Sequence, residues 1–283
     1  MFINNYFILI TRAKHIELFS KLIRTNDINL VIRYLKANTN TKNILNKKNN
    51  LSLYPILVAT VINNIEMVQL LLNYANSNNI VLELNDNNNK FGCYPLYVAI
   101  ENKNIEMVQL LINYAKKNNI LLELNKKEKE NGHYPLLKAF LNNNIEIPKL
   151  LKNYANEKKI TLKLNEKDND GQYPILIATM RNNIEMVELL INYANEKNIT
   201  LELNEKDNYL RSPLFWTTEN NNIEMVNKLL DYAKEKNISL ELNEKEKENG
   251  YYPFLKAFLK KNIEMIELLI NYSKEKKNYF RIK

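Results

Sequence analysis

The sequence predicts a mainly all-α fold, an α-solenoid of stacked helix pairs joined by extended connectors. Three observations support this fold class. A unit of 39 or 40 residues recurs along the chain, marked by prolines in one phase: Pro55, Pro95, Pro135, Pro174, Pro213 and Pro253. Apolar residues within the unit follow the period of a helix. The 283 residues include only four glycines and seven prolines, too few for the loops of a typical α/β enzyme.

Each unit is expected to begin with a short helix that starts at the proline. Proline suits the first turn of a helix because its missing N–H would have no partner there in any case. The residue four positions later is small, which lets a neighbouring helix approach closely: Ala59, Ala99, Ala139, Ala178 and Ala257. Thr217 is the one departure from this pattern.

A longer second helix is predicted ten residues after each proline, over "IEMVELLINYANEK" and its variants. The asparagines directly before it are expected to cap its first free N–H groups: Asn64, Asn104, Asn144, Asn183, Asn222 and Asn262. Apolar residues cover more than half of its circumference, so it should be buried between neighbours. The asparagines expected to end it in a left-handed conformation are Asn79, Asn119, Asn198 and Asn237. Pro148, out of phase, predicts a local distortion.

An extended segment follows the second helix, with apolar residues at every second position, as in "NITLELN". The outward positions carry mainly carboxylates: Glu83, Glu123, Lys163, Glu202 and Glu241. A metal-binding column is one interpretation of this pattern. Stacked repeats lie too far apart for two of these carboxylates to share one small ion, so a solvated face is the favoured interpretation.

The connector before each proline is the only part of the unit whose length varies, and it varies by one residue. All four glycines occupy one phase of it: Gly92, Gly132, Gly171 and Gly250. A recurring glycine in a connector predicts a turn residue with positive φ. Ser52 and Leu210 replace it in two repeats. The leucine predicts a remodelled turn in its repeat.

These elements predict one continuous solenoid domain. Its expected parts are an N-terminal capping repeat at 1–46, repeats at 47–85, 86–125, 126–165, 166–204 and 205–243, and a C-terminal repeat at 244–283. The first part lacks the proline, as expected of a capping repeat. The C-terminal repeat has an apolar second helix, "IEMIELLINYS", whose outer face needs a cover. Either the chain's own tail covers it or the repeat associates with a partner, including a second copy.

The formal net charge of +8 is concentrated at the two ends of the chain. Residues 1–50 carry +7 and residues 256–283 carry +5, whereas residues 51–255 carry −4. A protein that tracks phosphates would concentrate cations along one continuous face. Polar ends on an elongated molecule are therefore the favoured interpretation. Binding of nucleic acid or of an anionic membrane through the basic ends stays open as the alternative.

No catalytic, cofactor or metal site is predicted, and the protein is expected not to be an enzyme. The histidines His15 and His133 have no cysteine or acidic partner at metal-ligand spacing. Cys93 has no base nominated beside it, and one cysteine excludes an internal disulfide framework. No phosphate-binding glycine motif occurs. A lone cysteine, without a secretory signal or a bilayer-spanning run, predicts an intracellular, cytoplasmic location.

The stretch "LNEKDNDGQYPILIA", at 164–178, resembles the connector and first helix of an ankyrin repeat, and "NNIEMVELLI" resembles its second helix. The likeness covers about residues 12–283 and recurs in phase. Ankyrin repeats have 33 residues, so about six residues are added here after the second helix. The family's Thr and His, which belong to an inter-repeat hydrogen-bond network, are replaced by Tyr and by Leu, Tyr or Phe. Replacing both together predicts an apolar contact between repeats.

The resemblance implies that the chain binds a protein through connector tips and the concave face of the first helices. Carried over by phase, the tip residues are Cys93, His133, Gln172, Arg211 and Tyr251. Those at the ends of the first helices are Glu101, Asn102, Met180, Arg181, Glu219, Asn220 and Lys260. Trp216 is a further candidate because aromatic residues dominate interface energies, although its phase is also compatible with a core position. A protein partner is thus expected, rather than nucleic acid.

Overall fold

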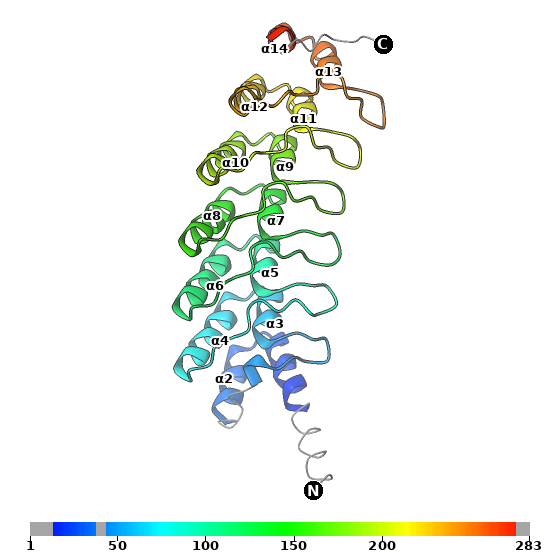
Figure 1. Ribbon diagram of the computed structural model, residues 1–283. Helices are drawn as coiled ribbons and strands as arrows, with labels where there is room; N and C mark the ends of the chain where they lie inside the picture. Colours follow the sequence, from blue (N-terminus) through cyan, green and yellow to red (C-terminus); the bar gives the residue numbers. More distant parts are fainter. Residues whose placement is uncertain (1–13, 38–43, 276–283) are drawn as a thin grey trace. The chain divides into compact units, whose positions relative to one another are not determined.

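The computed structural model describes residues 14–37 and 44–275 (Figure 1). The chain divides into two compact units, residues 1–139 and 140–283. After a helical segment at 14–24, unit 1 contains α2 (Ile28–Ala37), α3 (Pro55–Val61), α4 (Ile65–Ser77), α5 (Pro95–Glu101), α6 (Ile105–Lys117) and the start of α7 (Pro135–Leu141). After the end of α7, unit 2 contains α8 (Glu146–Lys158), α9 (Pro174–Met180), α10 (Ile184–Lys197), α11 (Pro213–Glu219), α12 (Ile223–Glu235), α13 (Pro253–Leu259) and α14 (Ile263–Glu275).

Each repeat consists of a seven-residue first helix and a second helix of 13 or 14 residues. Within each unit the first helices form one row and the second helices another, and the connectors extend beyond the row of first helices (Figure 1). No strand occurs among residues 14–37 and 44–275. The predicted all-α fold with extended connectors is therefore confirmed.

The first helices begin as predicted, with proline in the first turn after an extended residue such as Tyr173 (ψ 163°). The small residue at the centre of each is fully buried, as Ala178 is in α9. Where Thr217 replaces alanine in α11, its hydroxyl donates to the carbonyl of Leu214 at 2.9 Å. The departure therefore leaves no unpaired polar group in the core.

The asparagine before the second helix forms two hydrogen bonds at once. In α10, the Asn183 side-chain oxygen accepts from the N–H of Met186 at 3.1 Å, which is the predicted cap. Its amide nitrogen also donates to the side chain of Asn143 in the preceding repeat, at 3.0 Å. The same pair of bonds recurs at Asn104 and Asn222. Aspartate or serine could cap the helix equally well, but neither would supply the amide donor to the neighbouring repeat.

The prediction that Asn144 caps its helix in the same way is wrong. Its side chain accepts from the N–H of Glu146 at 2.8 Å, and α8 begins one residue late, after Ile145 (ψ −24°). Pro148 lies in the first turn of this helix and has no N–H to donate. The local distortion expected from that proline is therefore confirmed.

The helix ends and helix–helix turns also follow the sequence. The asparagines expected to end the second helices in a left-handed conformation have φ between 54° and 56°: Asn79, Asn119, Asn198 and Asn237. The helix–helix turns contain asparagines with the same conformation: Asn63, Asn143, Asn182 and Asn221. Lysine replaces asparagine at three of these positions: Lys103 (φ 57°), Lys159 (φ 57°) and Lys261 (φ 55°). Asparagine tolerates this conformation better than other residues with a Cβ, which explains its frequency at these positions.

The extended segments show the predicted alternation, with Leu82 and Leu84 buried and Glu83 exposed between them. Because they do not pair as strands, their backbone groups need other partners. A tyrosine from the second helix of the following repeat is one such partner. The hydroxyl of Tyr193 donates to the carbonyl of Ile160 and accepts from the N–H of Leu162, at 3.3 and 3.1 Å.

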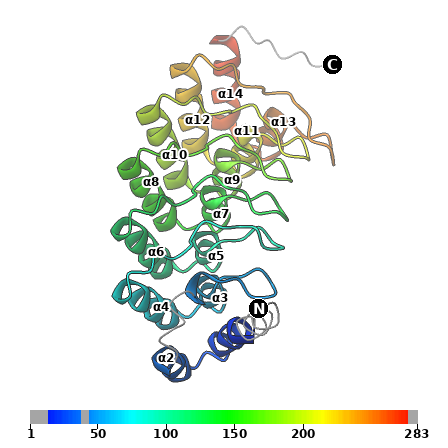
Figure 2. The same cartoon turned by 60° about the horizontal axis from the view of Figure 1, so that its bottom comes forward.

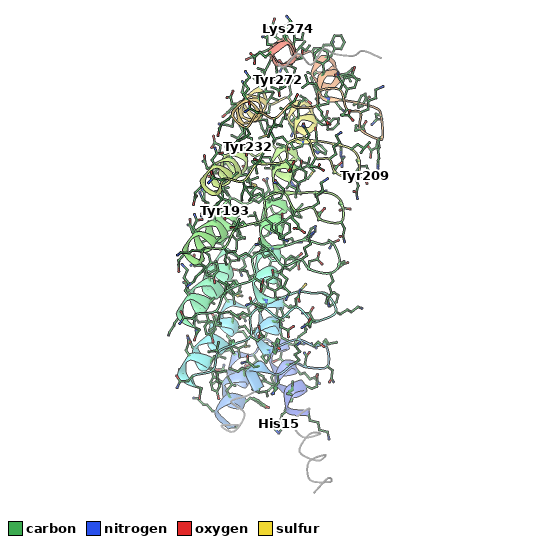
Figure 3. The ribbon with its side chains drawn as sticks, in the orientation of Figure 1. His15, Tyr193, Tyr209, Tyr232, Tyr272 and Lys274 are labelled. Carbon is green, nitrogen blue, oxygen red and sulfur yellow. The ribbon has the colours of Figure 1, made fainter. Side chains whose placement is uncertain are left out.

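The same two bonds are made by Tyr114, Tyr232 and Tyr272. Figure 3 labels three of these tyrosines on α10, α12 and α14. Each binds the extended segment of the preceding repeat, 31 to 34 residues upstream in the sequence. The tyrosine hydroxyl thus replaces a neighbouring strand.

An asparagine from the preceding repeat pairs with the remaining backbone groups of the same segments. The amide nitrogen of Asn165 donates to the carbonyl of Thr200 at 2.8 Å, and its oxygen accepts from the N–H of Glu202 at 3.2 Å. Asn46, Asn85 and Asn204 form the equivalent pairs. The recurring Leu-Asn pair in the sequence therefore joins each repeat to the next.

The tyrosine of the Tyr-Pro motif corrects one expectation. The ring is fully buried at Tyr94, Tyr134 and Tyr173, but the contact between repeats is not purely apolar, contrary to the prediction. The hydroxyl of Tyr94 lies 2.8 Å from the carbonyl of Glu123 and 3.1 Å from that of Lys126, and Tyr173 is placed in the same way. A phenol carries a polar group at the end of an apolar ring, so it can fill the core and still donate to the next repeat's backbone.

Each connector is a turn built around one buried acid or amide side chain. Asp168 accepts from the N–H groups of Asp170 and Gln172, at 2.9 and 2.8 Å. Two connectors have one more residue between the buried side chain and the proline. In these connectors the buried residue is a glutamate, Glu128 or Glu246, whose side chain is longer than that of aspartate. Glu246 accepts from three backbone N–H groups, which hold its pKa below the ordinary value although burial opposes this.

The turn at Leu210 is not remodelled, which overturns that prediction. Leu210 has a φ of 62°, close to the 75° of Gly171, and its N–H donates to the carbonyl of Asp207 just as Gly171 donates to Asp168. Asp207 accepts from the second and fourth following N–H groups, as Asp168 does. The framework therefore holds a leucine in a left-handed conformation that glycine adopts more easily.

We predict that Leu210→Gly raises the free energy of unfolding by about 0.5–1 kcal/mol. Relief of the left-handed strain outweighs glycine's larger loss of chain entropy, and the leucine side chain is already 42% exposed. Chemical denaturation measures the change. Gly171→Ala is the control with the opposite sign, because its Cβ would lie 3.1 Å from the Asn208 backbone nitrogen. A destabilised Leu210→Gly variant would contradict the assignment of strain.

Candidate protein-interaction surface

The side chains predicted to bind a partner fall on the first helices and connectors of both units. In Figure 2 the connectors of unit 2 lie beside α9, α11 and α13, away from the second helices. The larger group belongs to this unit: Gln172, Met180, Arg181, Arg211, Trp216, Glu219, Asn220, Tyr251 and Lys260. Unit 1 carries Cys93, Glu101, Asn102 and His133.

Arg211 is the centre of a cluster at one connector tip of unit 2. Its Nε lies 2.9 Å from a carboxylate oxygen of Asp207, the buried residue that holds the turn. Its guanidinium carbon lies 4.4 Å from the ring centre of Tyr209 and 4.7 Å from that of Trp216. Such cation–π contacts are more favourable where solvent is partly excluded, as it is here. The connector tip is thereby joined to the first turn of α11.

Trp216 occupies a helix phase that valine, isoleucine or lysine fills in the other repeats. It is half-buried, and the ring of Phe215 meets it edge-on at 5.8 Å. Its indole N–H is shielded from solvent and has no hydrogen-bond acceptor among the described residues. A buried donor without a partner costs about 1–3 kcal/mol.

A second cationic group lies on the next first helix. The amine of Lys256 lies 2.9 Å from Glu219, 4.1 Å from the ring centre of Tyr251 and 5.5 Å from that of Phe215. Lys260, at the end of α13, lies 3.9 Å from the same carboxylate. Lys256, which was not among the residues predicted from the sequence, thus contacts both Glu219 and Tyr251.

Some predicted residues have a structural role on this surface. The side-chain amide of Asn220 donates to the carbonyl of Thr179 at 2.9 Å, at the end of the preceding first helix. Arg181 reaches the carbonyl of Leu141 at 3.4 Å but is otherwise exposed and forms no ion pair with the described residues. Gln172 and Met180 are partly exposed. Asn220 is therefore a link between repeats more than a free contact residue.

In unit 1 the corresponding residues also pair with neighbouring groups. Glu101 lies 2.9 Å from Lys138, and Asn102 donates to the carbonyl of Thr60 at 3.1 Å, as Asn220 does in unit 2. His133 lies 4.0 Å from Glu128, the buried group of its own connector. The salt bridges Lys138–Glu101 and Lys256–Glu219 share one sequence signal. A lysine lies three residues after the proline of one repeat, and a glutamate lies six residues after the proline of the preceding repeat.

Cys93 is not placed as a nucleophile. Burial raises the pKa of its thiol to about 12, and the carboxylates of Glu101, Glu128 and Glu130 act in the same direction. A thiol is reactive as the thiolate, which this environment disfavours at neutral pH. Among residues 14–37 and 44–275, no three His, Cys, Asp or Glu side chains gather in a way that could hold a metal ion.

The fold and this surface define a helical repeat protein of the kind that binds other macromolecules. The chain belongs to the ankyrin-repeat family: the family profile "Ankyrin repeats (3 copies)" matches residues 10–121, 78–163, 114–198 and 158–241. Among curated proteins, none matches the chain. Ankyrin repeats generally mediate protein–protein interactions, are generally not catalytic and usually occur inside cells. No helix in the described part of the chain is long and apolar enough to cross a membrane.

We predict that native Cys93 reacts with iodoacetamide at pH 8 at least about a hundredfold more slowly than a free cysteine. Only a minute fraction of a thiol with a pKa near 12 is ionised at that pH, and ionisation rises only as the pH approaches that value. Mass spectrometry of timed samples measures the rate. The same chain in denaturant should react at the ordinary rate; equally fast labelling of the native chain would contradict the assignment.

Proposed function

We propose that this ankyrin-repeat protein is not an enzyme and binds another protein through its connector tips and the face of its first helices. The observation that carries the proposal is a constant backbone framework beneath side chains that differ between repeats. The connectors before the six phased prolines each contain a turn residue with positive φ, whether glycine, serine or leucine occupies that position. A surface of this construction can change its contacts without changing its fold.

The residue two before each proline illustrates this division. Its backbone N–H is bound by the buried acid or amide, as in Gln172 with Asp168 and Arg211 with Asp207. Its side chain is half-exposed in five consecutive repeats and different in each: Cys93, His133, Gln172, Arg211 and Tyr251. The tyrosine and proline that follow are nearly always the same and are mostly buried. We expect the varied side chains to determine partner choice, and a cytoplasmic protein to be the partner.

The alternative is binding of nucleic acid or an anionic membrane through the basic ends. On the second helices of unit 2, lysines are paired with carboxylates of neighbouring repeats, as in Lys149 with Glu185 and Lys228 with Glu188. Such pairing leaves few cations for phosphates on the face of the second helices. Phosphate binding should weaken steeply as salt is raised, which separates the alternative from a shape-matched protein interface.

We further propose self-association through the C-terminal repeat. Phe258 and Ile263 are 63% and 71% exposed on α13 and α14, at positions that are covered by the next repeat elsewhere in unit 2. A second copy of the chain offers the same kind of helix pair. Phe258→Asp with Ile263→Asp should shift sedimentation from dimer to monomer, whereas Glu264→Lys should not. A wild-type chain that is monomeric at 100 μM, on the order of the weakest specific dimers, would contradict this proposal.

We predict that the triple variant Arg211→Ala, Trp216→Ala and Tyr251→Ala loses at least about tenfold of its recovered partner in affinity capture from the source cell. A few central aromatic and arginine side chains supply most of the energy of an interface. Quantitative mass spectrometry of the captured proteins measures the loss.

The matched control is Asn153→Ala, Asn192→Ala and Asp231→Ala, three exposed residues in one phase of the second helices. Its partner recovery should equal that of the wild type. Circular dichroism and denaturation should show that both triple variants are folded. Undiminished partner recovery by the triple variant that contains Trp216→Ala, or an equal loss of recovery in both triple variants, would refute the assignment of the first-helix face as the binding surface.

A further inference from the structure

The first helices of unit 2 carry cations that their ion pairs do not fully neutralise. Arg211 pairs with Asp207, Lys256 and Lys260 share Glu219, and Lys256 also interacts with Glu246. Arg181 forms no ion pair with the described residues. Arg211 uses only its Nε for Asp207, and no partner occupies the terminal nitrogens of its guanidinium among the described residues. Lys260 shares a carboxylate that Lys256 already approaches more closely. Three of these cations can therefore bind a further anion.

The cationic residues are held in position before any ligand arrives. Arg211 is fixed by one carboxylate and two aromatic rings, and Lys256 by one carboxylate and two further rings. Pre-organised side chains lose less entropy on binding than mobile lysines on an open surface. The ring of Trp216 lies against the Arg211 guanidinium, and its indole N–H has no acceptor among the residues that the structure describes. A ligand with both carboxylate and carbonyl oxygens would complement all of these groups.

The helix register sets the spacing of such a ligand. Arg181 and Lys260 follow the ends of α9 and α13, with α11 between them. Packed helices lie about 8–10 Å apart, so the two cations are separated by roughly 16–20 Å along the row. An extended peptide covers that distance with about five or six residues. Carboxylates about six residues apart would reach both ends of the row.

We propose that the first-helix face of unit 2 binds an extended acidic peptide segment of its protein partner, with Trp216 at the centre and Arg181 and Lys260 at the ends. This deepens the proposed function and rests on it. Arg211 donates its terminal N–H groups to a carboxylate or carbonyl of the peptide. The Trp216 ring, held against the Arg211 guanidinium, lies beside the bound peptide.

Nucleic acid fits this surface less well. The neighbouring connectors carry exposed or partly exposed carboxylates, among them Asp170, Glu205 and Glu248. These would repel a continuous run of phosphates, whereas a short peptide that ends within the cationic row avoids them. The aromatic rings, moreover, are already engaged by Arg211 and Lys256 and are not free for stacking on bases.

The test uses Trp216 as its own reporter, because it is the only tryptophan of the chain. The full chain is titrated with an octapeptide that has two glutamates at each end of a four-residue apolar centre, which places glutamates six residues apart, and tryptophan fluorescence is followed. Matched peptides replace the glutamates with glutamine or with lysine, and an octathymidylate represents nucleic acid. We expect the acidic peptide to change the emission and to bind at least tenfold more tightly than the glutamine peptide.

Charge reversal locates the site. Arg181→Glu with Lys260→Glu should weaken binding of the acidic peptide at least tenfold. Lys159→Glu with Lys274→Glu, at exposed positions after the end of α8 and on α14, should change binding less than twofold. Equal effects of the two pairs, or tighter binding of the oligonucleotide, would overturn the proposal. Equal binding of all three peptides would contradict the proposal that the bound segment is acidic, but it would not contradict the proposed protein-binding function. No response to any peptide, together with undiminished partner capture by the Trp216 variant, would overturn both.

Discussion

The architecture of each unit depends on how the backbone of the extended segments is hydrogen-bonded. These segments are the main addition to the ankyrin repeat, and they form no strand in the described chain. Their peptide groups are bound instead by side chains from both neighbouring repeats: a tyrosine hydroxyl, such as that of Tyr232, and an asparagine amide, such as that of Asn165. A tyrosine or asparagine side chain can both donate and accept, so one residue satisfies two backbone groups.

This arrangement explains why asparagine recurs so often in the sequence. Asparagine caps a helix and binds the previous repeat, ends helices in a left-handed turn, and pairs with the next extended segment. Each role needs either a combined donor and acceptor or tolerance of positive φ, and asparagine has both properties. The framework residues are thereby constrained, while the half-exposed positions beside them are free to vary. We expect the residues that determine partner choice to lie at these half-exposed positions.

Much of the fold could be predicted from the sequence because it follows from local rules. Proline starts, asparagine caps and left-handed turns depend on neighbouring residues and recur in phase. Interactions between repeats were harder to predict: the hydroxyl of Tyr94 was expected in an apolar contact, and Leu210 in a remodelled turn. Both depend on groups about 30 to 40 residues away or on strain that the surrounding turn overcomes. Lys256 was missed as a surface residue because only its pairing with Glu219 identifies it.

Amide hydrogen exchange in a Tyr193→Phe variant tests most directly whether side chains hold the extended segments. Loss of the hydroxyl leaves the N–H of Leu162 without its acceptor, so its exchange should accelerate at least tenfold, while the N–H of Leu240, bound by Tyr272, should change little. Unfolding should cost about 1–3 kcal/mol less than in the wild type. Tyr209→Phe, at a tyrosine 47% exposed on a connector tip, should leave both amides unaffected. Unchanged exchange at Leu162 in the Tyr193 variant would contradict the account.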